Sequence, residues 1–74
     1  MLNDIEKAIV IKHLHNKLKS ETGHYYVVRC ISTPSMEINK HTFIADCLPL
    51  SSLGYRVLNM KISLTDEEIS YILL

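Results

Sequence analysis

The sequence predicts a single α+β domain over residues 1–74, with a helix at each end and an antiparallel sheet of three or four short strands between them. Three observations predict this class. Residues 4–20 have apolar side chains at helical spacing, residues 24–63 show strand-like composition or alternation, and residues 65–74 open with a helix-capping sequence. Consecutive strands flanked by two helices favour an antiparallel sheet with both helices packed on one face.

The N-terminal helix is expected to begin at Asn3 or Asp4, both of which are favoured N-caps, and to end near Glu21 because Gly23 follows. Its apolar side chains form two patches on a helical wheel instead of one stripe. One patch contains Leu2, Ile5, Ala8 and Ile9, and the other contains Val10, Ile11, Leu14 and Leu18. The second patch has the i, i+4, i+8 spacing of a buried stripe, so it is predicted to pack on the sheet.

Residues 24–32, "HYYVVRCIS", are rich in β-branched and aromatic side chains and are predicted to form a strand that is largely buried on both faces. Thr33-Pro34-Ser35 should end this strand.

Two interpretations of residues 35–48 remain open. The favoured one is a pair of short strands around a turn at Asn39-Lys40. The other is a short helix over residues 35–47, with Pro34 at its first position. Pro49 ends the segment in either case.

Residues 55–63 alternate between Leu58, Met60 and Ile62 on one face and Asn59, Lys61 and Ser63 on the other, which predicts a strand with one solvated face. A turn is expected at residues 51–54, before this strand. The C-terminal helix should begin with a capping box formed by Thr65 and Glu68. Ile69, Ile72 and Leu73 share one face of that helix, whereas Tyr71 and Leu74 point elsewhere.

Composition excludes some functions and favours others. Eight basic and eight acidic residues cancel, so the positive excess that is typical of nucleic-acid binders is missing. No apolar run reaches the ~20 residues of a membrane span, and Asp4 and Glu6 stand where a signal peptide would be basic and then apolar. No standard lipid-anchor motif is present. These features predict a cytoplasmic protein that does not associate with membranes.

No catalytic, metal or cofactor motif is evident. Cys30 and Cys47 are interpreted as buried thiols that act as small apolar residues, and the chain has no C-x-x-C. His13 and His15 are two residues apart, so on a helix their side chains point about 200° apart and cannot share an ion. Whether Cys47 meets His24 or His41 in space depends on tertiary geometry, which the sequence leaves open. We therefore expect no enzyme activity, no bound metal and no cofactor.

The unexplained apolar side chains are the main indication of function. Either they cover each other within one chain, or a second chain covers them. Because so short a chain buries little surface by itself, we predict that another chain covers them. The predicted interface contains Leu2, Ile5, Ile9, Tyr71 and Leu74.

The predicted function is therefore that of a small non-enzymatic regulator, inhibitor or adaptor that acts through protein–protein contact. It should bind a second copy of itself as a homodimer, with one other protein as a further candidate partner. The alternative is a small winged-helix-like DNA-binding regulator, for which Lys12, Asn16 and Lys19 supply a short polar stripe on the first helix.

Overall fold

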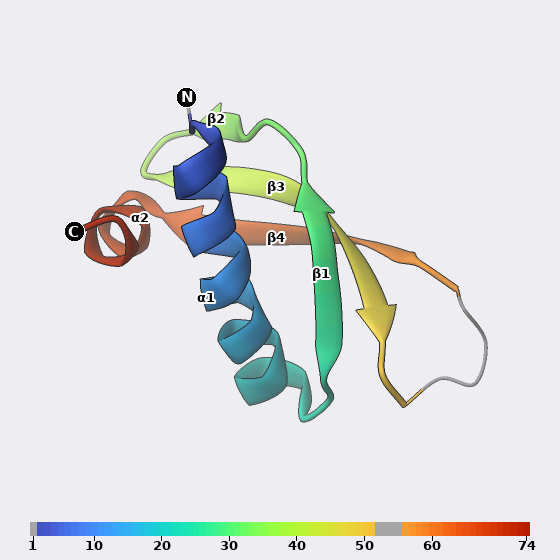
Figure 1. Ribbon diagram of the computed structural model, residues 1–74. Helices are drawn as coiled ribbons and strands as arrows, with labels where there is room; N and C mark the ends of the chain where they lie inside the picture. The colour runs from blue at the N-terminus through green and yellow to red at the C-terminus, as the bar shows by residue number, and fades with distance from the viewer. Residues whose placement is uncertain (1, 52–55) are drawn as a thin grey trace.

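The computed structural model describes residues 2–51 and 56–74. The elements follow in the order α1 (Asp4–Thr22), β1 (Tyr26–Ile31), β2 (Ser35–Glu37), β3 (Lys40–Pro49), β4 (Leu58–Thr65) and α2 (Asp66–Ile72). In Figure 1, α1 crosses in front of the sheet and α2 lies beside it. The predicted α+β class, with an antiparallel sheet of four strands between two helices, is confirmed.

The long strand β3 forms the centre of the sheet. Its first eight residues pair with β4 along the whole of that strand. Its other edge pairs with β2 near its start and with β1 near its end. Between these two strands, the Ser32 N–H donates to the Ile44 carbonyl at 2.9 Å. β1 and β2 are therefore two parts of one interrupted strand, and the sheet is an antiparallel meander.

The two interpretations of residues 35–48 are resolved in favour of the hairpin. The turn lies at Ile38 and Asn39, one residue earlier than predicted, because Lys40 already pairs with Glu37 in the ladder. Asn39 has a φ of 64°, in the left-handed region that asparagine tolerates better than most residues. Its carbonyl also accepts the Asp66 N–H at 3.1 Å, which connects this turn to the start of α2.

One apolar cluster forms the core between the helices and one face of the sheet. As predicted, Val10, Leu14 and Leu18 of α1 are buried in it, and Ile11 packs against it. The sheet contributes residues from β1, β3 and β4, and α2 contributes Ile69. The buried sheet residues are Val28, Ile31, Phe43, Ala45, Cys47, Ile62 and Leu64.

The prediction that β1 is buried on both faces was wrong. Only Val28 and Ile31 are buried in this strand, whereas Val27, Arg29 and Cys30 are exposed. Both described helices lie on the same side of the sheet, so the opposite face of β1 has no helix over it. A register shift between Val28 and Cys30 also breaks the alternation along the strand. The exposure of Cys30 corrects the prediction of two buried thiols, which holds for Cys47 alone.

The alternation predicted for the last strand holds from Asn59 onward. In β4, Ile62 is buried and Met60 is half-buried, whereas Asn59, Lys61 and Ser63 are exposed. Leu58, which was predicted to share the face of Met60 and Ile62, is exposed at the start of the strand. The turn predicted for residues 51–54 lies, apart from Ser51, outside the described residues.

Local side-chain chemistry fixes the helix ends. Asn3 is the N-cap of α1: its side chain accepts the Glu6 N–H at 2.8 Å, and the Glu6 carboxylate accepts the Asn3 N–H at 3.0 Å. Gly23, with a φ of 77°, ends α1 in the left-handed conformation expected of a C-terminal glycine. Thr65 caps α2 by accepting the Glu68 N–H at 3.1 Å. The predicted capping box is only half formed, because the Glu68 carboxylate bonds to Lys17 Nζ instead of returning to the N-cap. Neither described helix is long and apolar enough to cross a membrane.

Candidate interaction surface

The side of α1 that faces away from the sheet carries two large apolar residues. Ile5 is 74% exposed and Ile9 is 40% exposed. They are one helical turn apart, whereas Val10 and Leu14, from the other patch, have no exposed surface. The two patches predicted from the sequence are therefore divided between solvent and core.

The C-terminal helix α2 has the same division. Ile69 is buried and Ile72 and Leu73 pack against the core, as their spacing predicts. Tyr71, in contrast, is 79% exposed and Leu74 is fully exposed. Ile5, Ile9, Tyr71 and Leu74 are together called the outer helix surface below.

Leu2 is the one predicted interface residue with a different place. It is half-buried and packs against the core cluster. Together with Pro34, Met36 and His41 it lines a small hollow beside the first turn of α1. Leu2 thus packs against the monomer core, beside residues of the β2–β3 hairpin.

Polar contacts hold α2 against α1 and the sheet. The Glu68 carboxylate accepts a hydrogen bond from Lys17 Nζ at 3.1 Å and lies 3.9 Å from His13 Nε2. His41 Nε2 lies 2.8 Å from an Asp66 carboxylate oxygen. These contacts join α1, β3 and α2, so they hold α2 beside α1 and the sheet.

The Lys17–Glu68 pair changes the titration of both groups. Partial burial raises the pKa of Glu68, but the hydrogen bond and charge of Lys17 outweigh this effect, so the pKa of Glu68 lies below its usual value. Partial burial likewise lowers the pKa of Lys17, and its hydrogen bonds to Glu68 and Glu21 outweigh that effect, so the pKa of Lys17 is raised. The pair is therefore ionised at neutral pH.

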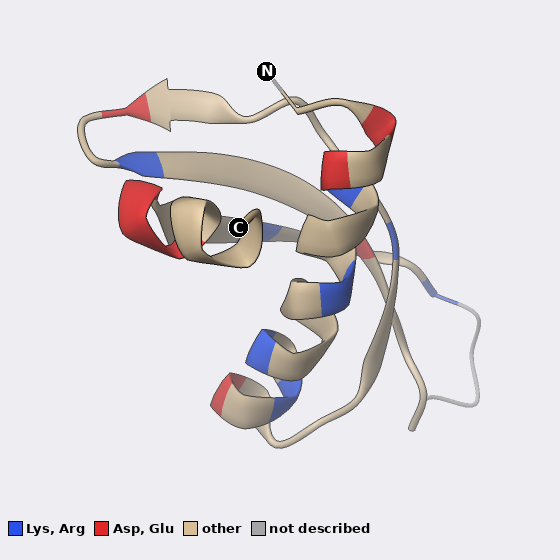
Figure 2. Cartoon of the chain, turned by 60° about the vertical axis from the view of Figure 1, so that its left-hand side comes forward, with Lys and Arg blue, Asp and Glu red and all other residues tan. Residues whose placement is uncertain are grey.

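Charge is unevenly distributed over the two helices, as Figure 2 shows. The first turn of α1 contains Asp4 and Glu6, and the first turn of α2 contains three acidic residues. The rest of α1 is mostly basic, with lysines at positions 7, 12, 17 and 19. Acidic and basic regions thus border the outer helix surface.

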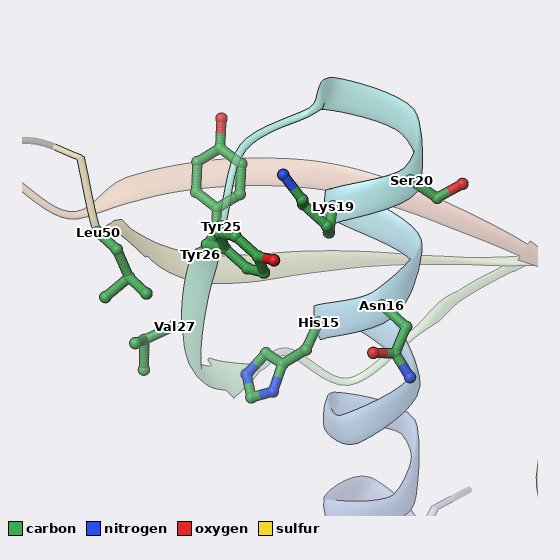
Figure 3. Close-up of a pocket in the computed structure, with 8 residues that line it drawn as sticks. All are labelled: His15, Asn16, Lys19, Ser20, Tyr25, Tyr26, Val27 and Leu50. Carbon is green, nitrogen blue, oxygen red and sulfur yellow. The ribbon is translucent and has the colours of Figure 1, made fainter.

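A second feature is an open groove between the C-terminal half of α1 and the start of β1, shown in Figure 3. Its volume is about 600 Å³, within the range of small-molecule sites. Two of its polar side chains, however, bond within the chain. Lys19 Nζ donates to the Gly23 carbonyl at 2.8 Å and lies 4.2 Å from the centre of the Tyr25 ring. His15 Nε2 accepts the Val28 N–H at 3.0 Å. The outer helix surface is the stronger candidate because its large apolar side chains are exposed on helices whose other apolar residues fill the core.

Neither thiol has the surroundings of a nucleophile. Burial raises the pKa of Cys47, whose Sγ contacts the Ala45 carbonyl at 3.6 Å. Cys30 is exposed, but its thiol donates to the Asp46 carboxylate at 3.1 Å, and this bond raises its pKa. A raised pKa disfavours the reactive thiolate.

The histidines are spread over different contacts. His13 faces Glu68 and His15 faces Val28, so the two side chains diverge as predicted for positions i and i+2 of a helix. Over residues 2–51 and 56–74, no three His, Cys, Asp or Glu side chains converge in a way that could hold a metal ion.

Sequence reasoning missed two features of this region. One is the hydrogen bond that the backbone N–H of Val28, in β1, donates to His15 Nε2. The other is the Lys17–Glu68 pair, which joins residues 51 positions apart. Lys17 lies between the two apolar patches of α1, so the spacing of apolar residues did not indicate that its side chain is half-buried.

Comparison of the chain with family models, with curated proteins and with solved structures found no match.

Proposed function

We propose that this protein is a small non-enzymatic regulator, inhibitor or adaptor that acts through protein–protein contact and forms a homodimer through its outer helix surface. The observation that carries the proposal is the division of apolar residues within each helix. Ile5, Ile9, Tyr71 and Leu74 face solvent, although neighbouring residues of the same helices fill the core.

The energetics support this proposal. Burying one aliphatic side chain is worth about 1.5–3 kcal/mol, and a cluster of exposed ones is typical of interaction sites. A chain of 74 residues has a small core and a thin stability margin, which association can increase. Homodimers are the most frequent oligomers, so a second copy is the first partner to test.

A cytoplasmic location is part of the proposal. Cys30 and Cys47 are both free thiols in the structure, and they would remain reduced there. One other protein is retained as a further partner, since adaptors and inhibitors need a target.

Sedimentation equilibrium at ~100 μM protein tests the self-association. The parent chain should sediment as a dimer, and Ile5→Asp should sediment as a monomer because a carboxylate replaces an apolar contact. Ile44→Asp is the matched control. Ile44 is also exposed, but it lies on the sheet face opposite the helices and beside Lys61, which can pair with the new carboxylate. A parent that remains an 8.5 kDa monomer would contradict the proposal.

The contribution of α2 needs a separate variant. Tyr71→Ala combined with Leu74→Ala should raise the dissociation constant of the dimer about tenfold or more, while the urea midpoint of the dissociated chain stays close to that of the parent. A lower midpoint with unchanged association would show that both side chains stabilise the monomer instead.

The nucleic-acid alternative predicts different behaviour. Retention on heparin that falls steeply with salt would favour it, because release of counterions is the signature of phosphate binding. Lys12 and Asn16 are exposed on α1 as this alternative requires, whereas Lys19 already bonds to the Gly23 carbonyl.

A further inference from the structure

The exposed side of α1 changes character along its length. Ile5, Ala8 and Ile9 are exposed in the first half of the helix, and Lys12 and Asn16 are exposed on the same side in the second half. A partner helix that covers this side therefore meets an apolar segment only near the N-terminal end of α1.

The order of charges along α1 distinguishes two ways of pairing it with a second copy. In a parallel pair, each Lys12 would lie beside the Lys12 of the other copy, and the two helix dipoles would point in the same direction. In an antiparallel pair, Asp4 would approach Lys12 of the other copy, and the dipoles would oppose each other. Opposite charges at such positions are favourable and like charges are unfavourable.

The apolar residues define where the two-fold axis would lie. Contact between Ile5 and Ile9 of the second copy requires an axis midway between these positions, close to Lys7 and Ala8. Lys7 is half-buried on the inner side of α1, so the small exposed side chain of Ala8 lies nearest the axis. A small residue at this point lets two helices approach closely, since the distance between packed helices depends on the side chains at the contact. The same axis brings Asp4 to within one helical turn of Lys12 of the second copy.

We infer that the partner of the outer helix surface is a second copy of this chain, bound with the two α1 helices antiparallel around a two-fold axis at Ala8. This inference rests on the proposed function. A second copy is favoured over an unrelated helix because α1 itself carries both the acidic residue and the basic residue that an antiparallel pair would bring together.

Engineered disulfides test the orientation. In a Cys30→Ser background, which removes the exposed native thiol, Ala8→Cys should form a covalent dimer under mild oxidation. Asn16→Cys should not, because an axis at residue 7 or 8 separates the two copies of position 16 by about 25 Å along the helices. A disulfide needs Cα atoms within about 7 Å. In a parallel pair, both variants would cross-link.

Charge reversal tests the pairing of Asp4 with Lys12. Each of Asp4→Lys and Lys12→Asp should raise the dissociation constant about fivefold at low salt, because each variant places like charges at two symmetric positions. The double variant should return the constant close to the parent value. Far-UV circular dichroism and urea midpoints for all three variants separate loss of contact from loss of folding.

The outcomes separate this inference from the proposed function. A chain that stays monomeric at every concentration overturns both. A dimer that cross-links at position 16 as readily as at position 8, or at neither position, leaves the proposed function standing and overturns the antiparallel arrangement. A double variant that associates more weakly than either single variant also overturns it.

Discussion

At the level of single residues, Glu68 makes the contacts that place α2. Its backbone N–H bonds to Thr65 and its carboxylate to Lys17, so one residue serves both the cap and the contact between helices. Because its folded-state pKa is lowered, the ion pair stabilises the folded chain above the ordinary pKa of 4.5. This contribution is lost as the pH falls through the lower folded-state pKa.

Glu68→Gln should therefore lower the free energy of unfolding at neutral pH by about 0.5 kcal/mol, the magnitude of a partly exposed ion pair. The difference from the parent should shrink as the pH falls below 4.5 and vanish once the carboxyl group is protonated in both states. Urea unfolding over a series of pH values from neutral to acid measures this. Glu67→Gln, an exposed neighbour, serves as the control. An unchanged difference at low pH would show that packing of the side chain, and not its charge, stabilises α2.

At the level of elements, α1 is defined by its ends more than by its apolar pattern. Its apolar residues point in two directions, so no single stripe specifies its length. The capping box of Asn3 and Glu6 and the left-handed Gly23 specify it instead. The C-terminal half of the helix then lies where His15 can reach the backbone of β1.

Asn3→Ala should lower the free energy of unfolding by about 1 kcal/mol, since it removes the acceptor for the Glu6 N–H. Asn16→Ala is the matched control, because Asn16 is exposed within the helix and alanine has the higher helix propensity. Thermal or urea unfolding gives both values. Equal effects of the two substitutions would mean that the capping box adds no stability.

At the level of the whole molecule, the two helices of the described residues both cover the same face of the sheet. Phe43 and Ile44 are neighbours in β3, yet Phe43 is 0% exposed and Ile44 is 44% exposed. The former packs under the helices, and the latter lies on the opposite face beside Lys61. A domain this small depends on that single core for its stability.

Phe43→Ala should lower the free energy of unfolding by about 3–5 kcal/mol, which is close to the whole stability of a small domain. Ile44→Ala should cost less than about 1 kcal/mol. Urea unfolding of both variants at low protein concentration makes the comparison. A cost at Ile44 that equals the cost at Phe43 would show that the second sheet face is also covered.

The sequence alone determined the α+β class and the core-facing sides of both helices, but it left residues 35–48 open between a hairpin and a helix. Helical spacing identified Val10, Leu14 and Leu18, and alternation placed Met60 and Ile62 on the inner face of β4, because each pattern reports which side chains leave water together. The sequence also separated Ile5, Ile9, Tyr71 and Leu74 from the core residues of the same helices.

Only the tertiary structure decided which faces were covered and which distant residues met. The burial of β1 was overestimated because its β-branched and aromatic composition is the same for a strand covered on one face or on two. Whether a side chain of β1 is buried, including that of Cys30, depends on where it lies relative to the helices. The contacts of Lys17 with Glu68 and of His15 with Val28 join segments that are separated along the chain. No local pattern encodes such pairs, because they form only after packing has fixed the positions of the backbones.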